Sequence, residues 1–201
     1  MPFPTLRFLA AAIAVVFTGC ASRSLPKYQK PIARSQFQTV RTTAYTHSES
    51  DHRKYGQRNA LGSGLQSGSV QSAAADWSRW PAGTVFRILE TGETYQVDDY
   101  GWALAGTNTI DLYKSSRGQM NAWGVRQVNI EVLRWGDPDR SLAVLRPRAK
   151  YAHVRRMISQ IEDRRAEITR SLPPSPTLYI ANQPPSAPTT PLTPFTTSSV
   201  R

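Results

Sequence analysis

The sequence predicts a mainly β fold, a small barrel or sandwich that occupies the middle of the chain. Short segments rich in β-branched and aromatic residues recur between about residues 38 and 136, separated by glycine-containing turns. One of them alternates strictly, with apolar residues at Val128, Ile130 and Val132. Several short strands joined in this way are typical of a sandwich or barrel. A length of 201 residues suits one such domain with accessory segments.

The predicted strands follow one another at short intervals. The first covers residues 39–45 and runs into a polar loop, and a glycine-rich stretch follows at 61–68. Residues 84–89 and 94–97 are expected to pair as a hairpin around the turn Thr91-Gly92-Glu93. Two later strands are predicted at 110–113 and 125–133. We therefore place the folded domain at residues 38–136.

The pattern changes to helical spacing after Gly136. Residues 147–172 are predicted to form one amphipathic helix, with Pro147 in its first turn and an apolar side that includes Val154, Met157, Ile161 and Ile168. Its other side carries several arginines, which either contact an anionic surface or form a solvated face. Residues 173–201 are rich in Pro, Thr and Ser and are expected to be a disordered tail.

The N-terminal residues are typical of an export signal. Arg7 precedes a short apolar run at 8–17, too short to span a bilayer as a mature helix, and the run ends in Phe17-Thr18-Gly19-Cys20. This ending resembles the bacterial lipobox, in which the cysteine is lipidated. We expect a signal peptide at 1–19, lipid attachment at Cys20 and a tether at 20–37. The alternative is ordinary signal cleavage nearby.

A lipidated Cys20 would place the protein in the cell envelope. No acidic retention signal follows the cysteine, which favours the outer membrane if the cell has two membranes. The net charge of +11 favours a polyanionic partner, whether nucleic acid, anionic lipid or an acidic wall polymer. No nucleic-acid-binding motif is present, so we expect no nucleic acid partner.

Cysteine and histidine usage argues against several kinds of site. A single cysteine excludes a disulfide framework and a cysteine metal cluster. The three histidines, His47, His52 and His153, lack zinc-ligand spacing and are expected at the surface. No phosphate loop or Ser-His-Asp arrangement is visible either. We predict no metal and no cofactor.

Three aspartates stand where predicted strands meet loops. They are Asp76 after an alanine run, Asp99 before Tyr100-Gly101, and Asp111 within Ile110-Asp111-Leu112-Tyr113. Side chains at such junctions project from a rigid scaffold toward a cleft or solvent. Asp111 has an apolar strand context, where a carboxylate is costly unless it is paired. Asp76 could instead bind backbone amides in a turn, and Asp98 is expected to be solvated.

These segments together resemble the 3D domain, named for three aspartates, of MltA-type lytic transglycosylases and small cell-wall proteins. The matching segments occur in the family's order: Thr43-Ala44-Tyr45, Gly62 to Gly68, Ala75-Asp76 with Pro81-Ala82-Gly83-Thr84, Asp99-Tyr100-Gly101, Ile110-Asp111-Leu112-Tyr113 and Ala122-Trp123-Gly124. The resemblance implies a six-stranded double-psi β-barrel with the aspartates at one groove. Two departures are Tyr100 and Trp102, which are bulkier than the family's usual residues.

The resemblance also implies roles for individual residues. Asp111 maps to the usual acid, and Asp99 and Asp76 map to supporting positions. We expect Tyr100, Gly101 and Trp102 to line the substrate groove. Six aromatic residues of this region could stack on sugar faces, but core packing is the default and at least half are expected to be core: Tyr45, Trp77, Trp80, Tyr100, Trp102 and Trp123.

One carboxyl group suffices for a particular cleavage of peptidoglycan. Muramic acid supplies its own nucleophile, the C6 hydroxyl, so one group can act first as acid and then as base. The first hypothesis is therefore a lytic transglycosylase that acts on peptidoglycan glycan strands. The second is a lipoprotein that binds peptidoglycan without cutting it, and the third is a structural lipoprotein. The sequence lacks a match to the second domain of MltA-type enzymes, which favours the second hypothesis. We expect a monomer.

Overall fold

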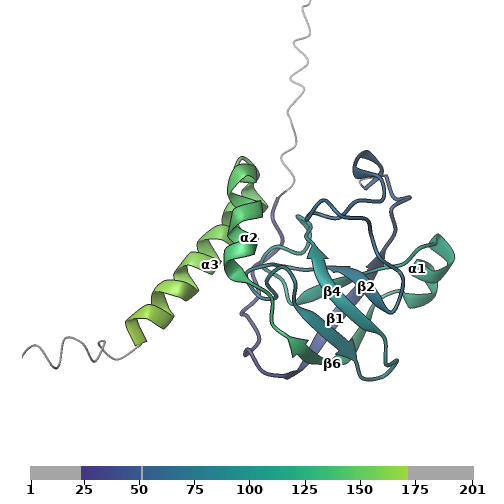
Figure 1. The fold of residues 1–201 in the computed structure, drawn as a ribbon, viewed down its shortest axis with the longest axis horizontal. Coiled ribbons are helices and arrows are strands. Elements are labelled where there is room, and N and C mark those ends of the chain that lie inside the picture. The colour runs from purple at the N-terminus through teal and green to yellow at the C-terminus, as the bar shows by residue number, and fades with distance from the viewer. Residues whose placement is uncertain (1–23, 51, 172–201) are drawn as a thin grey trace, which may run out of the picture.

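The structure is a computed structural model that describes residues 24–50 and 52–171. Its centre is a closed barrel of six strands, beside which two helices pack as a separate layer (Figure 1). The strands are β1 (Phe37–Tyr45), β2 (Val70–Ala74), β3 (Val85–Ile88), β4 (Thr94–Asp99), β5 (Thr109–Tyr113) and β6 (Arg126–Arg134). The predicted β-barrel of about six strands is therefore confirmed.

The strand order has an internal two-fold pattern. Around the barrel the order is β1-β5-β2-β4-β3-β6, with β6 returning to β1. β1 pairs with β5 in parallel, as β2 pairs with β4, and the other four pairings are antiparallel. Exchanging β1 with β4, β2 with β5 and β3 with β6 reproduces every pairing. The second three strands thus repeat the connectivity of the first three.

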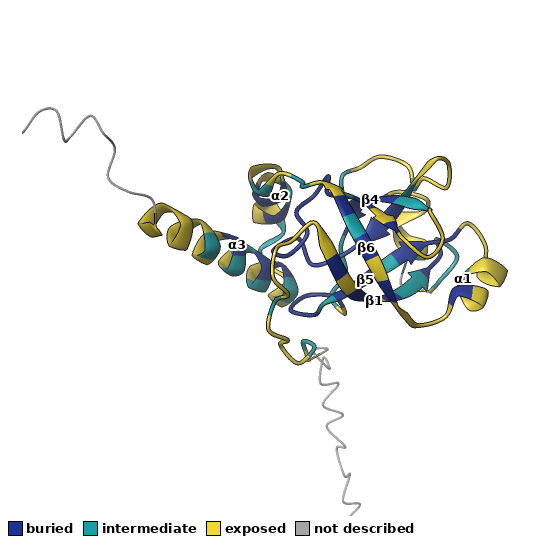
Figure 2. Cartoon of the chain, turned by 90° about the horizontal axis from the view of Figure 1, so that it is seen from below, coloured by how far each residue is buried: buried dark blue, intermediate teal, exposed yellow. Residues whose placement is uncertain are grey.

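Apolar side chains from the six strands fill the barrel interior. The buried apolar side chains form one large cluster, and Figure 2 shows buried residues concentrated in the strands of the barrel. Trp77 and Trp80, in the turn after β2, are 0% and 1% exposed and close one side of this core. Burying an apolar side chain of this size contributes roughly 1.5–3 kcal/mol. The interior residues include Val40, Phe86, Ile88, Tyr95, Val97, Ile110, Leu112, Val128, Ile130 and Val132.

β2 was not predicted as a strand. Its sequence VQSAA has one large β-branched residue and small side chains elsewhere, so it lacks the pattern by which strands are recognised. β2 lies between β4 and β5 in the barrel, and Ser72, Ala73 and Ala74 are buried. Small residues fit there because loops cover the outer face while the core occupies the inner one.

The helical region differs from the single helix predicted at 147–172. It contains α2 (Pro138–Leu145), the 3-10 turn η2 (Arg146–Arg148) and α3 (Ala152–Ser171). Pro147 lies in η2, so the prediction that it begins the long helix is wrong. The apolar stripe is confirmed at Val154, Met157 and Ile161, which are buried, whereas Ile168 is 52% exposed.

Two short elements complete the described fold. They are the 3-10 turn η1 (Arg53–Tyr55) and the helix α1 (Arg117–Trp123). None of the helices within 24–50 and 52–171 has the length and apolar character that crossing a membrane requires. The predicted signal peptide at 1–19, the lipid site Cys20 and the predicted disordered tail at 173–201 lie outside the described residues.

The later part of the predicted tether lies against the barrel. The Gln29 amide donates to the Gly106 carbonyl at 2.8 Å, and Arg156 Nη1 donates to the Pro26 carbonyl at 2.8 Å. Arg79 Nη2 also donates to the Gln29 carbonyl at 2.5 Å. Residues 26–30 are therefore held between the loop that precedes β5 and the first turns of α3.

Candidate active site

Two of the predicted aspartates lie in one row across the outer face of the barrel. Ala74 on β2 is in register with Asp111 on β5 and with Asp99 on β4. Thr43 on β1 is the next residue in this row, in register with Asp111. Because adjacent strands lie about 4.8 Å apart, the Cα atoms of Asp111 and Asp99 are separated by about 10 Å.

Tyr45 connects the carboxylates of this row. Its hydroxyl donates to Asp99 Oδ2 at 3.4 Å, and the ring is 8% exposed. Burial raises the pKa of Tyr45 well above its ordinary value, and the charges of Asp99, Asp98 and Asp111 raise it further. The charges of three carboxyl groups thus act on one phenol, and one of these groups, Asp99, accepts its hydrogen bond. Core packing was the default expectation for Tyr45 and its burial agrees with it, but the hydrogen bond to Asp99 was not predicted.

Asp111 is the most accessible carboxylate of the row. Its side chain is partly exposed, whereas those of Asp98 and Asp99 are 5% and 9% exposed. The Thr43 hydroxyl donates to Asp111 Oδ1 at 2.6 Å and fixes the orientation of the carboxyl group. A distance of 2.6 Å is at the short end of the range for O–H···O hydrogen bonds in proteins. Asp111 is therefore held rigidly at a position that a substrate can reach.

Asp99 is buried at the end of β4. Its Oδ1 accepts the Tyr100 amide at 2.8 Å. Burial raises the pKa of Asp99 to about 7, the Tyr100 amide opposes this rise, and the neighbouring Asp98 carboxylate adds to it. Asp99 consequently exchanges a proton near neutral pH, within the same row as Asp111.

This raised pKa predicts a pH-dependent stability. Because the pKa of an unfolded aspartate is about 3.9, the stabilising effect of protonated Asp99 is complete below about pH 4. It is lost as the pH rises through about 7, the folded-state pKa. Between about pH 5 and pH 8 we expect wild type to lose roughly 2–3 kcal/mol of unfolding free energy relative to Asp99→Asn. Urea unfolding at both pH values measures this, and parallel pH profiles of the two proteins would contradict it.

Asp98 is buried, which corrects the prediction that it is solvated. Its Oδ2 accepts the Ser72 hydroxyl at 2.6 Å and the Asn59 side-chain amide at 2.9 Å. Burial raises the pKa of Asp98, and these two hydrogen bonds oppose the rise. The pairing of β2 with β4 shifts register between Ala73 and Ala74, so Asp98 and Asp99 do not alternate cleanly between two faces. A loop that contains Asn59 covers Asp98.

Asp76 makes contacts of a different kind from the carboxylate row. It is fully buried, and its Oδ1 accepts the Ser78 amide at 2.8 Å and the Ser78 hydroxyl at 2.6 Å. Its Oδ2 accepts the Gly106 amide at 2.5 Å and lies 3.7 Å from Arg79 Nε. These bonds join the turn after β2 to the loop before β5. Of the two roles considered for Asp76, this geometry favours the structural one, in which the carboxylate stabilises the turn after β2.

The predicted groove residues follow directly after Asp99. Tyr100 packs edge-on against Trp77, with 4.9 Å between ring centroids, and its hydroxyl accepts from Arg148 Nη1 at 3.2 Å. Gly101 and Trp102 are partly exposed. Four of the six aromatic residues considered above, Tyr45, Trp77, Trp80 and Trp123, are buried, so the core reading is confirmed for them.

The histidines are less exposed than predicted. His47 Nδ1 lies 2.8 Å from the Tyr113 hydroxyl, and the His52 ring packs 5.5 Å from the Tyr45 ring. His153 is half-buried between Tyr100 and Tyr151. All three are partly exposed, so they lie at the surface but are not fully solvated as expected. Each histidine lies beside a tyrosine, either near the carboxylate row or at the start of α3. Contacts such as those of His47 with Tyr113 and of His153 with Tyr100 join distant parts of the chain, so the local sequence does not predict them.

A cavity of about 620 Å³ lies apart from the carboxylate row. Its lining includes Gln71, Glu93, Lys114, Trp123 and Arg126, and none of the three aspartates. Lys114 Nζ donates to Glu93 Oε1 at 3.1 Å and to the Tyr95 hydroxyl at 2.7 Å. The groups beside this cavity are thus engaged in a mutually satisfied network. Although Asp111 does not line this cavity, it is the group suited to proton transfer, because it is accessible and shares its row with Asp99, which titrates near pH 7.

The functional assignment rests on the geometry of this site, because comparisons with known proteins found no match. No family model matches the chain, and no curated protein matches it significantly. The arrangement itself is suited to acid–base chemistry: one accessible carboxyl held by a hydroxyl, and a second carboxyl that titrates near pH 7.

Proposed function

We propose that the protein is a lytic transglycosylase that cleaves the MurNAc–GlcNAc bond of peptidoglycan, with Asp111 as the general acid and base. The observation that carries the proposal is the placement of a partly exposed, hydroxyl-held Asp111 in register with the row that contains Asp99. A single accessible carboxyl suits a reaction whose nucleophile belongs to the substrate.

The reaction would proceed in two proton transfers. Asp111 donates its proton to the glycosidic oxygen as the bond from C1 of MurNAc breaks, and GlcNAc leaves with a new hydroxyl. The C6 hydroxyl of the same MurNAc attacks C1, and its proton passes to the Asp111 carboxylate. The product is a 1,6-anhydro sugar, no water is consumed, and Asp111 regains its starting state. Asp99 and Tyr45 would tune the charge around Asp111.

A second candidate function is peptidoglycan binding without cleavage. The burial of Asp98 and Asp99 favours it, because only Asp111 of the three clustered carboxyls is readily accessible. Incubation of the purified protein with intact sacculi separates the two functions. Mass spectrometry should detect 1,6-anhydromuropeptides if the protein is an enzyme. Retention on sacculi without products would support the binding module. If the protein neither binds sacculi nor releases products, both functions are contradicted.

We also propose that the barrel has the double-psi topology of the 3D domain. The support is the two-fold connectivity of β1–β3 and β4–β6, with its two parallel pairings separated by the antiparallel β2–β5 pair. Peptidoglycan glycan strands are then the expected partner, the protein acts as a monomer without a cofactor or metal, and nucleic acid is not a ligand.

Lipid attachment at Cys20 is a separate proposal, supported by the apolar run that ends at Gly19-Cys20. Five residues separate Cys20 from Pro26, whose carbonyl accepts from Arg156, so an extended chain would hold the barrel within about 20 Å of the lipid. We expect Cys20→Ser to move the protein from the membrane fraction, the outer membrane if there are two, to the soluble fraction. Detergent-phase partitioning measures this shift. An unchanged distribution of the variant would contradict lipidation at Cys20.

A further inference from the structure

Aromatic rings form a line along one side of the carboxylate row. From β5 the line runs through Tyr113 and Tyr45, whose ring centroids lie 5.6 Å apart. His52 lies 5.5 Å beyond Tyr45, and Tyr55 of η1 lies 6.0 Å beyond His52. This half of the line leads outward from the buried Tyr45 to Tyr55, which is 57% exposed.

A second series of rings connects the barrel to α3. Tyr100 lies 6.0 Å from His153, and His153 stacks on Tyr151 at 5.7 Å. Both series reach Asp99, whose Oδ2 accepts the Tyr45 hydroxyl at 3.4 Å and whose Oδ1 accepts the Tyr100 amide at 2.8 Å. The two series therefore approach each other beside Asp99. Tyr151, at the far end, is 49% exposed.

Arg148 fixes the helical side of this arrangement. Its Nη1 donates to the Tyr100 hydroxyl at 3.2 Å, and its Nη2 donates to the Ala60 carbonyl at 3.1 Å. The Ala60 amide in turn stabilises the Asp99 carboxylate and opposes the rise in its pKa. η2 is thus tied to the loop that covers the carboxylate row, and the start of α3 is held in place relative to it.

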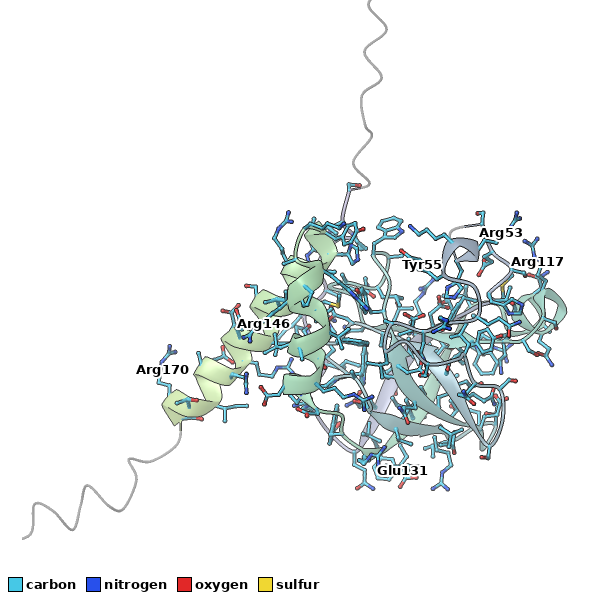
Figure 3. All side chains as sticks on the ribbon, turned by 45° about the horizontal axis from the view of Figure 1, so that its top comes forward. Arg53, Tyr55, Arg117, Glu131, Arg146 and Arg170 are labelled. Carbon is cyan, nitrogen blue, oxygen red and sulfur yellow. The ribbon has the colours of Figure 1, made fainter. Side chains whose placement is uncertain are left out.

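The exposed ends of the line carry both aromatic and cationic groups. Lys54 Nζ lies 4.7 Å from the centroid of the Tyr55 ring, and Lys150 Nζ lies 5.1 Å from that of Tyr151. Figure 3 shows Tyr55 between α2 and α3 on one side and Arg117 of α1 on the other. An aromatic ring offers an apolar face and a polar edge, which suits the C–H face of a sugar ring. A neighbouring ammonium group supplies hydrogen bonds and a charge for carboxylates.

We propose that η1 and the start of α3 form a saccharide-binding wall beside the carboxylate row, with Tyr55 and Tyr151 as its exposed sugar platforms. Its ligand is a polysaccharide strand with acidic substituents, whose carboxylates bind Lys54 and Lys150. This inference rests on the proposed function and deepens it. The helical region would hold the strand so that one glycosidic bond lies over Asp111.

The test is glycan binding by the double variant Tyr55→Ala with Tyr151→Ala. The control is Phe37→Ala, an equally exposed aromatic residue (60%) at the other end of β1 from Tyr45. Solubilised peptidoglycan strands are titrated against each protein. Because an aromatic contact is worth about 0.5–1.5 kcal/mol, losing both should weaken binding by about 10- to 100-fold. The control should bind like wild type, and all three proteins should melt at similar temperatures.

A second variant keeps both rings in place. Lys54→Gln with Lys150→Gln should weaken binding at low salt and leave it nearly unchanged at high salt, because salt screens exposed charges. If both double variants bind glycan as tightly as wild type, the proposed saccharide-binding wall is contradicted. The proposed function would stand in that case, because wild type would still bind and cleave. Absence of both binding and product release in wild type would instead contradict the proposed function itself.

Discussion

Replacing Asp111 by Asn should lower the release of 1,6-anhydromuropeptides by about 100- to 10,000-fold, the usual contribution of general acid–base catalysis. The amide keeps the size of the side chain and can still accept the Thr43 hydroxyl bond, which measures 2.6 Å in wild type. It cannot deliver a proton to the leaving oxygen or take one from the C6 hydroxyl. Binding to sacculi should therefore persist while turnover falls.

A matched control separates this effect from a general change of charge. Asp139→Asn alters an aspartate of α2 whose side chain is 68% exposed and pairs with Arg165, so it should retain wild-type turnover. Asp99→Asn should have a smaller effect than Asp111→Asn, because Asp99 is buried and would act through the charge around Asp111. Equal product release by Asp111→Asn and wild type would remove Asp111 from the mechanism.

The strands were predictable where large side chains alternate. β6 shows Val128, Ile130 and Val132 on one face, and all three are buried as the pattern requires. β2 has no such pattern, because both of its faces are covered and its neighbours leave room only for small residues. Its place between β4 and β5 is a property of the closed barrel, which a local window of sequence does not contain.

Two helices that were not predicted carry readable start signals. Asp137 caps α2 through a bond from the Asp139 amide at 2.8 Å, and Pro138 occupies the first turn. Ser116 caps α1 by accepting the Gln119 amide at 3.3 Å. These signals were obscured because α1 has seven residues and α2 has eight, too short for a helical period to be evident. α2 is separate from α3 because the 3-10 turn η2, which contains Pro147, lies between them.

The site was predicted in part. Strand ends and the family resemblance selected Asp99 and Asp111, and the structure places both in one row. Thr43 was noted only as part of a motif, and its bond to Asp111 depends on the parallel pairing of β1 with β5. The burial of Asp98 depends on a register shift and on a loop that closes over it. Long-range pairing of this kind leaves no trace in residue spacing.

Replacing Asp76 by Ala should lower the free energy of unfolding by about 3–5 kcal/mol, the usual cost of removing one partner of a buried charge pair. Asp76 accepts hydrogen bonds from Ser78 and Gly106, and its carboxylate lies beside Arg79, which is 4% exposed. Alanine leaves the guanidinium buried without its counter-charge and leaves the Gly106 amide without its acceptor. Urea unfolding measures the loss.

The control for Asp76→Ala is Asp139→Ala, which removes an exposed ion pair with Arg165 and should cost at most about 1 kcal/mol. Turnover measured beside the unfolding curve decides between the two roles considered for Asp76. A structural role predicts that the folded fraction of Asp76→Ala retains its turnover, because the carboxylate row does not depend on Asp76 for a proton. A variant that unfolds like wild type yet has lost turnover would show that Asp76 acts in the reaction, and the turn would then need another source of its stability.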